Sequence, residues 1–116
     1  MIILTDINDF NILLGDFLDE FYRSDNEVRC KAIANPPQFT SNEQVYAAII
    51  AATVHKLAND FKLDVPKWVY DKRFYLSKPY FDGNVKGNLR LVFMYKSPPE
   101  FKHRNLFVCE NILKRV

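Results

Sequence analysis

Apolar side chains recur at helical spacing in three segments of the chain, and these segments predict its principal helices. In residues 6–22 the apolar positions return every three or four residues, at Phe10, Leu13, Leu14, Phe17, Leu18 and Phe21. A short second helix is expected over residues 26–34, because Pro36 and Pro37 follow directly and disfavour further helical backbone. Between residues 40 and 63 one apolar stripe is flanked by alanines, so we expect this segment to be the central helix.

Two capping patterns support this assignment. Thr40-Ser41-Asn42-Glu43 predicts a capping box, in which the Thr40 hydroxyl accepts the amide hydrogen of Glu43 and the Glu43 carboxylate accepts that of Thr40. Ser97-Pro98-Pro99-Glu100 has the same pattern with proline at the first helical position. It predicts a second capping box that opens a short helical turn.

The second half of the chain places prolines beside large aromatic residues, a pattern typical of packed corners between helices. Residues 64–88 are expected to be irregular, with Trp68 as a core anchor. Residues 89–95 alternate like a strand, yet Val92 is their only β-branched member, so we expect a buried helix and keep a small β element as the alternative. Residues 1–116 are thus predicted to form one mainly α domain, a compact helical bundle with irregular corners rich in aromatic residues and proline.

Composition agrees with a globular protein in a reducing compartment. A chain of 116 residues with 48% hydrophobic content can bury a single core. No apolar run approaches the roughly 20 residues of a membrane span, and the first residues lack the basic start of a secretion signal. Cys30 and Cys109 have no metal-binding spacing, so we expect reduced, buried thiols and a cytoplasmic location without membrane contact.

Charge is divided unevenly between the two parts of the chain. Residues 1–66 carry 5 basic and 10 acidic side chains, whereas residues 67–116 carry 11 basic and 4 acidic ones. We expect the two parts to pack together and neutralise each other. The alternative is that the basic part faces an acidic protein partner or nucleic acid.

The sequence contains no recognisable catalytic or cofactor motif. Glycine-rich phosphate loops and the nucleophile elbow are absent, and His55 is followed four residues later by Asn59 rather than by a second metal ligand. We therefore expect no cofactor, no metal and no catalytic residues, and the protein is expected to be a non-enzymatic interaction protein. Two alternatives remain: a nucleic-acid-binding module that uses the basic half, and a small enzyme whose site forms only in three dimensions, with candidates His55, Asp60, His103 and Glu110.

Arg104 stands out because it lies between Phe101 and the apolar run of residues 106–108. A partly buried guanidinium must bind a carboxylate or carbonyl groups, and we expect it to tie the C-terminal turn to the acidic N-terminal half. The alternative is that it binds an anion or a partner. The candidate partner-binding residues are Lys72, Arg73, Lys102 and Arg104.

Several segments together resemble a family of small uncharacterised bacterial proteins. They are Asp16-Phe17-Leu18-Asp19-Glu20-Phe21-Tyr22, Asn35-Pro36-Pro37, residues 47–58, Val65-Pro66-Lys67-Trp68, Pro79-Tyr80-Phe81 and residues 97–108. Similar segments form the C-terminal part of antitoxin-type helix-turn-helix regulators. The likeness begins at residue 16, before which there is no segment of helix-turn-helix length. The resemblance therefore implies an antitoxin-like or regulatory component that docks on a protein partner, with a toxin-like enzyme as one candidate, rather than one that is expected to bind DNA directly.

Overall fold

The computed structural model describes residues 3–4, 10–36, 38–39, 44–81, 85–109 and 112–113. These residues form a mainly helical globule, as predicted, with principal extents of 42 × 29 × 26 Å. The helices are α1 (Phe10–Arg23), α2 (Asn26–Ile33), α3 (Gln44–Asp60), α4 (Asn88–Lys96) and α5 (Pro99–Lys102), with the short 3-10 turns η2 (Lys67–Tyr70) and η3 (Lys72–Phe74). None of the described helices is long and apolar enough to cross a membrane.

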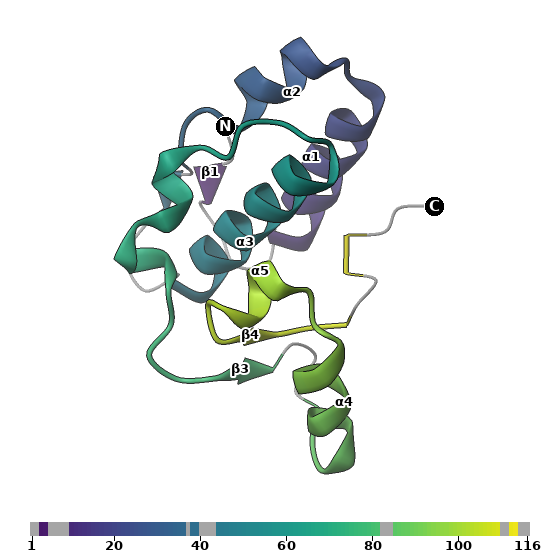
Figure 1. Cartoon of the computed structure of the whole chain (residues 1–116), viewed down its shortest axis with the longest axis vertical. Helices are drawn as coiled ribbons and strands as arrows, with labels where there is room; N and C mark the ends of the chain where they lie inside the picture. Colours follow the sequence, from purple (N-terminus) through teal and green to yellow (C-terminus); the bar gives the residue numbers. More distant parts are fainter. Residues whose placement is uncertain are drawn as a thin grey trace.

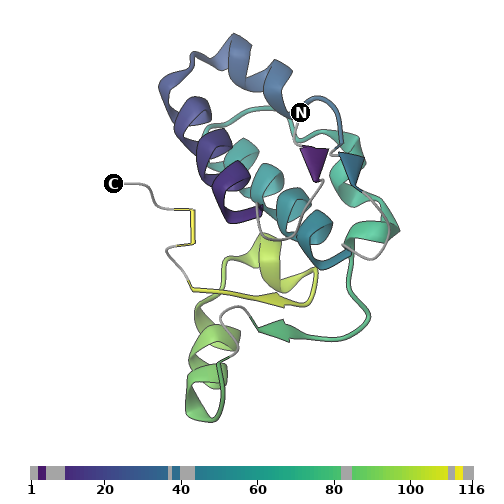
Figure 2. The same cartoon turned by 180° about the vertical axis from the view of Figure 1, so that it is seen from behind.

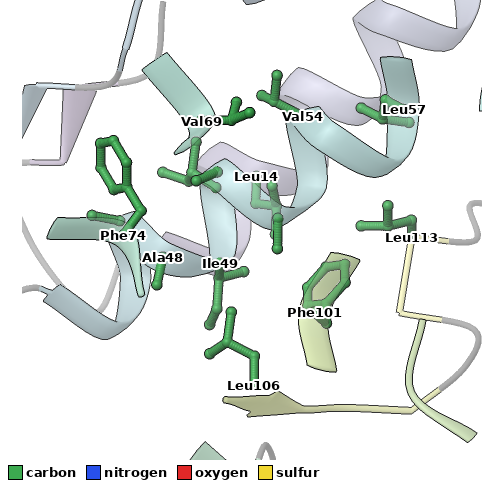
Figure 3. Packing of buried hydrophobic residues seen from close by; sticks show 14 of the residues in the cluster. Leu14, Ala48, Ile49, Val54, Leu57, Val69, Phe74, Phe101, Leu106 and Leu113 are labelled. Atoms are coloured by element: carbon green, nitrogen blue, oxygen red, sulfur yellow. The ribbon is translucent and has the colours of Figure 1, made fainter. Parts of the chain in front are cut away.

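Helix α3 is the centre of the structure, which confirms the prediction for this segment. Its buried positions are Ala47, Ala48, Ile49, Ile50, Ala51, Ala52, Thr53, Val54, Leu57 and Ala58. Because alanine side chains are short, η2, η3 and α5 can approach the helix closely on different sides. Figure 3 shows Val69 and Phe74 of the turns on one side of α3, and Phe101 and Leu106 on another. The predicted capping box at residues 40–43 lies outside the described residues.

Helices α1 and α2 form an N-terminal layer that packs against α3. Helix α1 contributes Leu14, Leu18 and Phe21 to the core. The Asp25 carboxylate accepts the amide hydrogen of Val28 and caps α2. Arg29 of α2 donates to the carbonyl of Phe21 at 2.9 Å, and its guanidinium lies 4.3 Å from the centre of the Phe61 ring. These contacts fix the angle between the two helices.

Two short parallel strand pairs join segments that are distant in sequence. Strand β1 (Ile3–Leu4) pairs with β2 (Gln38–Phe39), and β3 (Tyr80–Phe81) pairs with β4 (Leu106–Phe107). In the second pair the rings of Phe81 and Phe107 stack with their centres 5.0 Å apart. The strand alternative for residues 89–95 is wrong, because these residues lie within α4.

The second predicted capping box is also wrong, although a helical turn does begin at Pro99. Pro98 occupies the cap position and makes no side-chain hydrogen bond. The Ser97 hydroxyl instead accepts the amide hydrogen of Val108 at 2.8 Å, and the Glu100 carboxylate accepts from the Asn59 amide at 2.9 Å. Both groups that would form the local cap are used in contacts with distant segments.

Helix α4 lies at one end of the molecule. Figures 1 and 2 show it extending away from the layer of α1, α2 and α3, next to the β3–β4 pair. Helix α2 lies at the opposite end. The long axis of the protein therefore runs from an acidic N-terminal layer to a projecting helix in the basic half.

Candidate functional site

The large apolar side chains that the described residues expose are concentrated on α4. Elsewhere they occur singly, at Ile12, Val28 and Tyr70. Helix α4 exposes Leu89, Leu91, Val92, Met94 and Tyr95. Isolated exposed apolar residues are ordinary on protein surfaces, whereas a contiguous group of them marks a site of interaction. We therefore consider α4 the candidate functional site.

These side chains cover a wide part of the α4 surface. Leu91 and Tyr95 are four residues apart and lie one above the other, with Val92 beside them. Tyr95 is the most exposed of the group, at 79% of its possible area. The expectation of a buried helix is corrected here: the helix forms, but no described element covers this face. The sequence did not identify these residues as a surface site, because a helix rich in apolar residues is typical of the core.

The C-terminal end of α4 is held against the body of the protein by hydrogen bonds. The Ser97 hydroxyl oxygen accepts from the Val108 amide, and the hydroxyl can donate its own hydrogen to the carbonyl of Phe93 or of Val108. The Lys102 ammonium donates to the carbonyl of Tyr95 at 2.6 Å. This carbonyl belongs to the last turn of α4, where backbone acceptors lack partners within the helix.

The N-terminal end of α4 is also fixed. Gly87 precedes the helix with φ of 64°, a backbone conformation that residues other than glycine rarely adopt. Arg90 donates to the carbonyl of Val85 at 3.0 Å, and its guanidinium lies 4.7 Å from the centre of the Phe81 ring. Helix α4 is thus exposed along its length but anchored at both ends.

Positive charge surrounds this exposed helix. Lys86, Arg90, Lys96 and Lys102 lie on α4 or close to its ends, and residues 85–99 include no acidic side chain. None of the four cations forms an ion pair with a described residue. The exposed apolar face of α4 is therefore bordered by cations alone within this segment.

The two halves of the chain do not neutralise each other through ion pairs in the part of the structure that is described. The ion pairs there are Lys31 with Glu27, Lys56 with Asp60, and Arg73 with Asp71. Each pair joins residues at most four positions apart. These contacts therefore do not provide the expected pairing between the halves. Among the described basic side chains of the second half, Arg104 alone is buried.

Arg104, expected among the partner-binding residues, is corrected to a buried position with 1% of its area exposed. Its guanidinium donates to the carbonyl of Glu100 at 2.7 Å and to that of Val69 at 2.8 Å. The ring of Tyr75 lies 4.8 Å from the guanidinium carbon. No described carboxylate pairs with Arg104. It links α5 and η2 of the second half to His55 of α3, so its tie to the first half runs through an imidazole rather than an acidic side chain. A partner cannot reach this side chain in this structure.

His55 of α3 completes the surroundings of Arg104. Both terminal nitrogens of the guanidinium lie 3.3 Å from His55 Nδ1, which accepts from them when the imidazole is neutral and carries its hydrogen on Nε2. Burial, and next the positive charge of Arg104, lower the pKa of His55. His55 Nε2 lies 3.5 Å from the Tyr70 hydroxyl. His55 is thus half-buried, at the edge of the contact of α3 with η2 and α5.

Of the residues considered for a hidden catalytic site, the three that the structure describes are not joined to one another by a hydrogen bond or an ion pair. Asp60 binds Lys56 at 2.8 Å instead of approaching His55, and His103 is exposed. Glu110 lies outside the described residues. Among the residues with described side chains, no group of three or more His, Cys, Asp or Glu is arranged to hold a metal ion.

The remaining basic candidates lie apart from one another. Lys72 and Arg73 are exposed in η3, where the Arg73 guanidinium lies 4.7 Å from the centre of the Phe74 ring. Lys102 lies at the end of α5 and contacts Tyr95 of α4. The structure therefore places Lys102 beside the exposed helix and the η3 pair on a separate corner.

Trp68 borders a shallow hollow of about 470 Å³ between α2 and the segment of residues 64–68. The indole is half-buried, packs against Phe74, and donates its hydrogen to the carbonyl of Ile33 at 2.9 Å. Its polar group is therefore already used. Cys30 also lines the hollow and is exposed, as is Cys109, so the expectation of buried thiols is corrected.

Comparison with known proteins adds no relative from which a site could be transferred. No protein-family model, curated protein or solved structure matches the chain. The resemblance to antitoxin-type regulators is neither supported nor opposed by these comparisons.

Proposed function

We propose that this protein is a non-enzymatic interaction protein that docks on a protein partner through α4. An antitoxin-like or regulatory role, in which docking occludes the partner, agrees with the resemblance of its sequence segments. Lys102 takes part by holding the end of α4 in place. Lys72 and Arg73 add positive charge on a separate corner.

The observation that supports this proposal is the exposed apolar face of α4. Leu91, Val92 and Tyr95 would lose unfavourable contact with water when a partner covers them. The helix is anchored at both ends before binding, so docking would cost little additional ordering of the backbone.

Among the alternatives, a protein partner explains the exposed face better than nucleic acid does. Leucine, valine and methionine side chains donate no hydrogen bonds, whereas phosphates and base edges are recognised mainly by such bonds. Arg104 is turned into the protein and cannot contact a phosphate. The basic side chains of the second half suit an acidic protein equally well.

The test compares two variants of the full chain in which an equally exposed residue becomes aspartate. Leu91 on α4 is 64% exposed and Ile12 on α1 is 65% exposed, so both substitutions place a charge in solvent at the surface of a helix. Each tagged variant is used to recover proteins from a lysate of the native host, after circular dichroism has shown that it is folded. The recovered protein is then purified, and its dissociation constant with each variant is measured.

We expect Leu91→Asp to raise the dissociation constant at least about 30-fold, the effect of losing one central anchor, and Ile12→Asp to leave it within about threefold. Equal binding by both variants would exclude α4 as the docking element. If the chain recovers nucleic acid instead of a protein, and Leu91→Asp abolishes that recovery, the nucleic-acid alternative replaces this proposal.

A further inference from the structure

We infer that the partner receives α4 in an apolar groove edged by carboxylates, and that the occupant is a different protein rather than a second copy of this chain. This inference rests on the proposed function and specifies the chemistry of the partner. It is carried by three properties of α4: its charge, the distribution of exposed side chains around it, and its length.

Charge complementarity indicates an acidic rim on the partner. Lys86, Lys96 and Lys102 lie at the two ends of the exposed face, and no acidic residue occurs between residues 85 and 99. Arg90 extends from the other side of α4, where its guanidinium packs on Phe81. Lys102 is held in place by its hydrogen bond to the carbonyl of Tyr95, so its charge has a fixed position that a carboxylate of a partner can match.

The exposed side chains indicate a groove rather than a flat surface. At 100° per residue, Leu91, Val92 and Tyr95 fall on one side of α4, while Met94 and Leu89 lie towards its two flanks. A flat surface would cover only the central side chains. A groove covers the flanks as well, which is how amphipathic helices are bound by apolar grooves in proteins.

A second copy of the chain fits α4 poorly. Two α4 helices packed against each other, in either direction, would bring the lysines at the ends of one helix, Lys86 and Lys96, close to lysines of the other copy, with no acidic residue of α4 between them. The helix has nine residues and is therefore about 13 Å long. Two helices of this length share too short a seam to bury the roughly 1,000 Å² that a specific interface needs.

The test is charge reversal at Lys96, with reversal at Lys67 as the matched control. Both lysines are exposed and belong to the basic half, but Lys67 lies in η2, which Figure 1 shows on the side of the body away from α4. The two variants have the same net charge, so a difference between them reports on position. The probe is the purified protein recovered with the wild-type chain, and its association rate is measured at low and high sodium chloride concentration.

We expect Lys96→Glu to lower the association rate about tenfold at low salt, with most of the difference lost at high salt. Lys67→Glu should have a clearly smaller effect. Sedimentation velocity should show that the wild-type chain alone does not dimerise through α4, that is, that it forms no dimer which the Leu91→Asp substitution dissociates.

The outcomes separate the inference from the proposed function. If Leu91→Asp abolishes binding but the two lysine reversals behave alike, the acidic rim is refuted and docking through α4 stands. If the wild-type chain forms a dimer that Leu91→Asp dissociates, or binds no protein stoichiometrically, a separate partner is refuted. If Leu91→Asp binds like the wild type, both proposals fail.

Discussion

The Ser97 hydroxyl offers a direct test of how α4 is held. Ser97 is 3% exposed and Val108 is fully buried, and the Val108 amide donates to the Ser97 oxygen at 2.8 Å. In Ser97→Ala this amide is left buried without an acceptor. An unsatisfied buried donor costs about 1–3 kcal/mol, so we expect the free energy of unfolding to fall by that amount.

Ser24 provides the matched control. Its hydroxyl donates to the carbonyl of Glu20 four residues earlier, as that of Ser97 can to Phe93, but Ser24 is half-exposed and water can replace the bond. Ser24→Ala should therefore change stability by less than about 0.5 kcal/mol. Urea unfolding followed by circular dichroism gives both values, provided that the slope of the transition is unchanged. Equal stability of the two variants would refute the assigned role of the Ser97 hydroxyl, as would undiminished protection of the Val108 amide from hydrogen exchange in Ser97→Ala.

Two further predictions concern the core and its dependence on pH. Trp68→Ala should lower the free energy of unfolding by about 3 kcal/mol, because the variant loses the hydrogen bond to the Ile33 carbonyl and the packing on Phe74. Urea unfolding followed by circular dichroism measures this loss, and a value below about 1 kcal/mol would contradict the assigned packing. The pKa of His55 is lower in the folded state than its value of about 6.5 in the unfolded state. The contribution of His55 to stability is therefore constant above about pH 6.5 and declines as the pH falls below it, because the unfolded state takes up the proton first. The decline is complete once the pH is below the folded-state pKa. Urea titrations of the wild type and His55→Gln between about pH 7 and pH 5 should show this decline in the wild type and a flatter profile in the variant.

The helices were predictable from the sequence because their signals are local. The apolar spacing in α1 and α3 and the prolines after α2 each act within a few residues, and the structure confirms all three helices. The environment of α4 was not predictable in the same way. Spacing shows which side chains are apolar, but only the arrangement of other elements decides that Leu91 and Tyr95 remain uncovered.

The outcomes at Ser97 and Arg104 both depend on contacts between segments that are distant in sequence. The local pattern at Ser97 favours a capping box, but Val108 and Asn59 provide competing partners from 11 and 41 residues away in sequence, for Ser97 and Glu100 respectively. Flanking apolar residues correctly indicated that Arg104 is buried. Its partners on η2 and α3 are distant in sequence, and no local pattern identifies them.

Burial of Arg104 has a consequence for the direction in which α4 projects. The guanidinium connects α5, through the Glu100 carbonyl, to η2 and to α3. Helix α5 in turn ends at Lys102, which donates a hydrogen bond to the last turn of α4. A continuous series of contacts thus connects the central helix to the most exposed helix, and it begins at the buried guanidinium of Arg104. Lysine at position 104 would supply the charge without the planar fork that holds three segments at once, so the orientation of α4 depends on the shape of this side chain as much as on its charge.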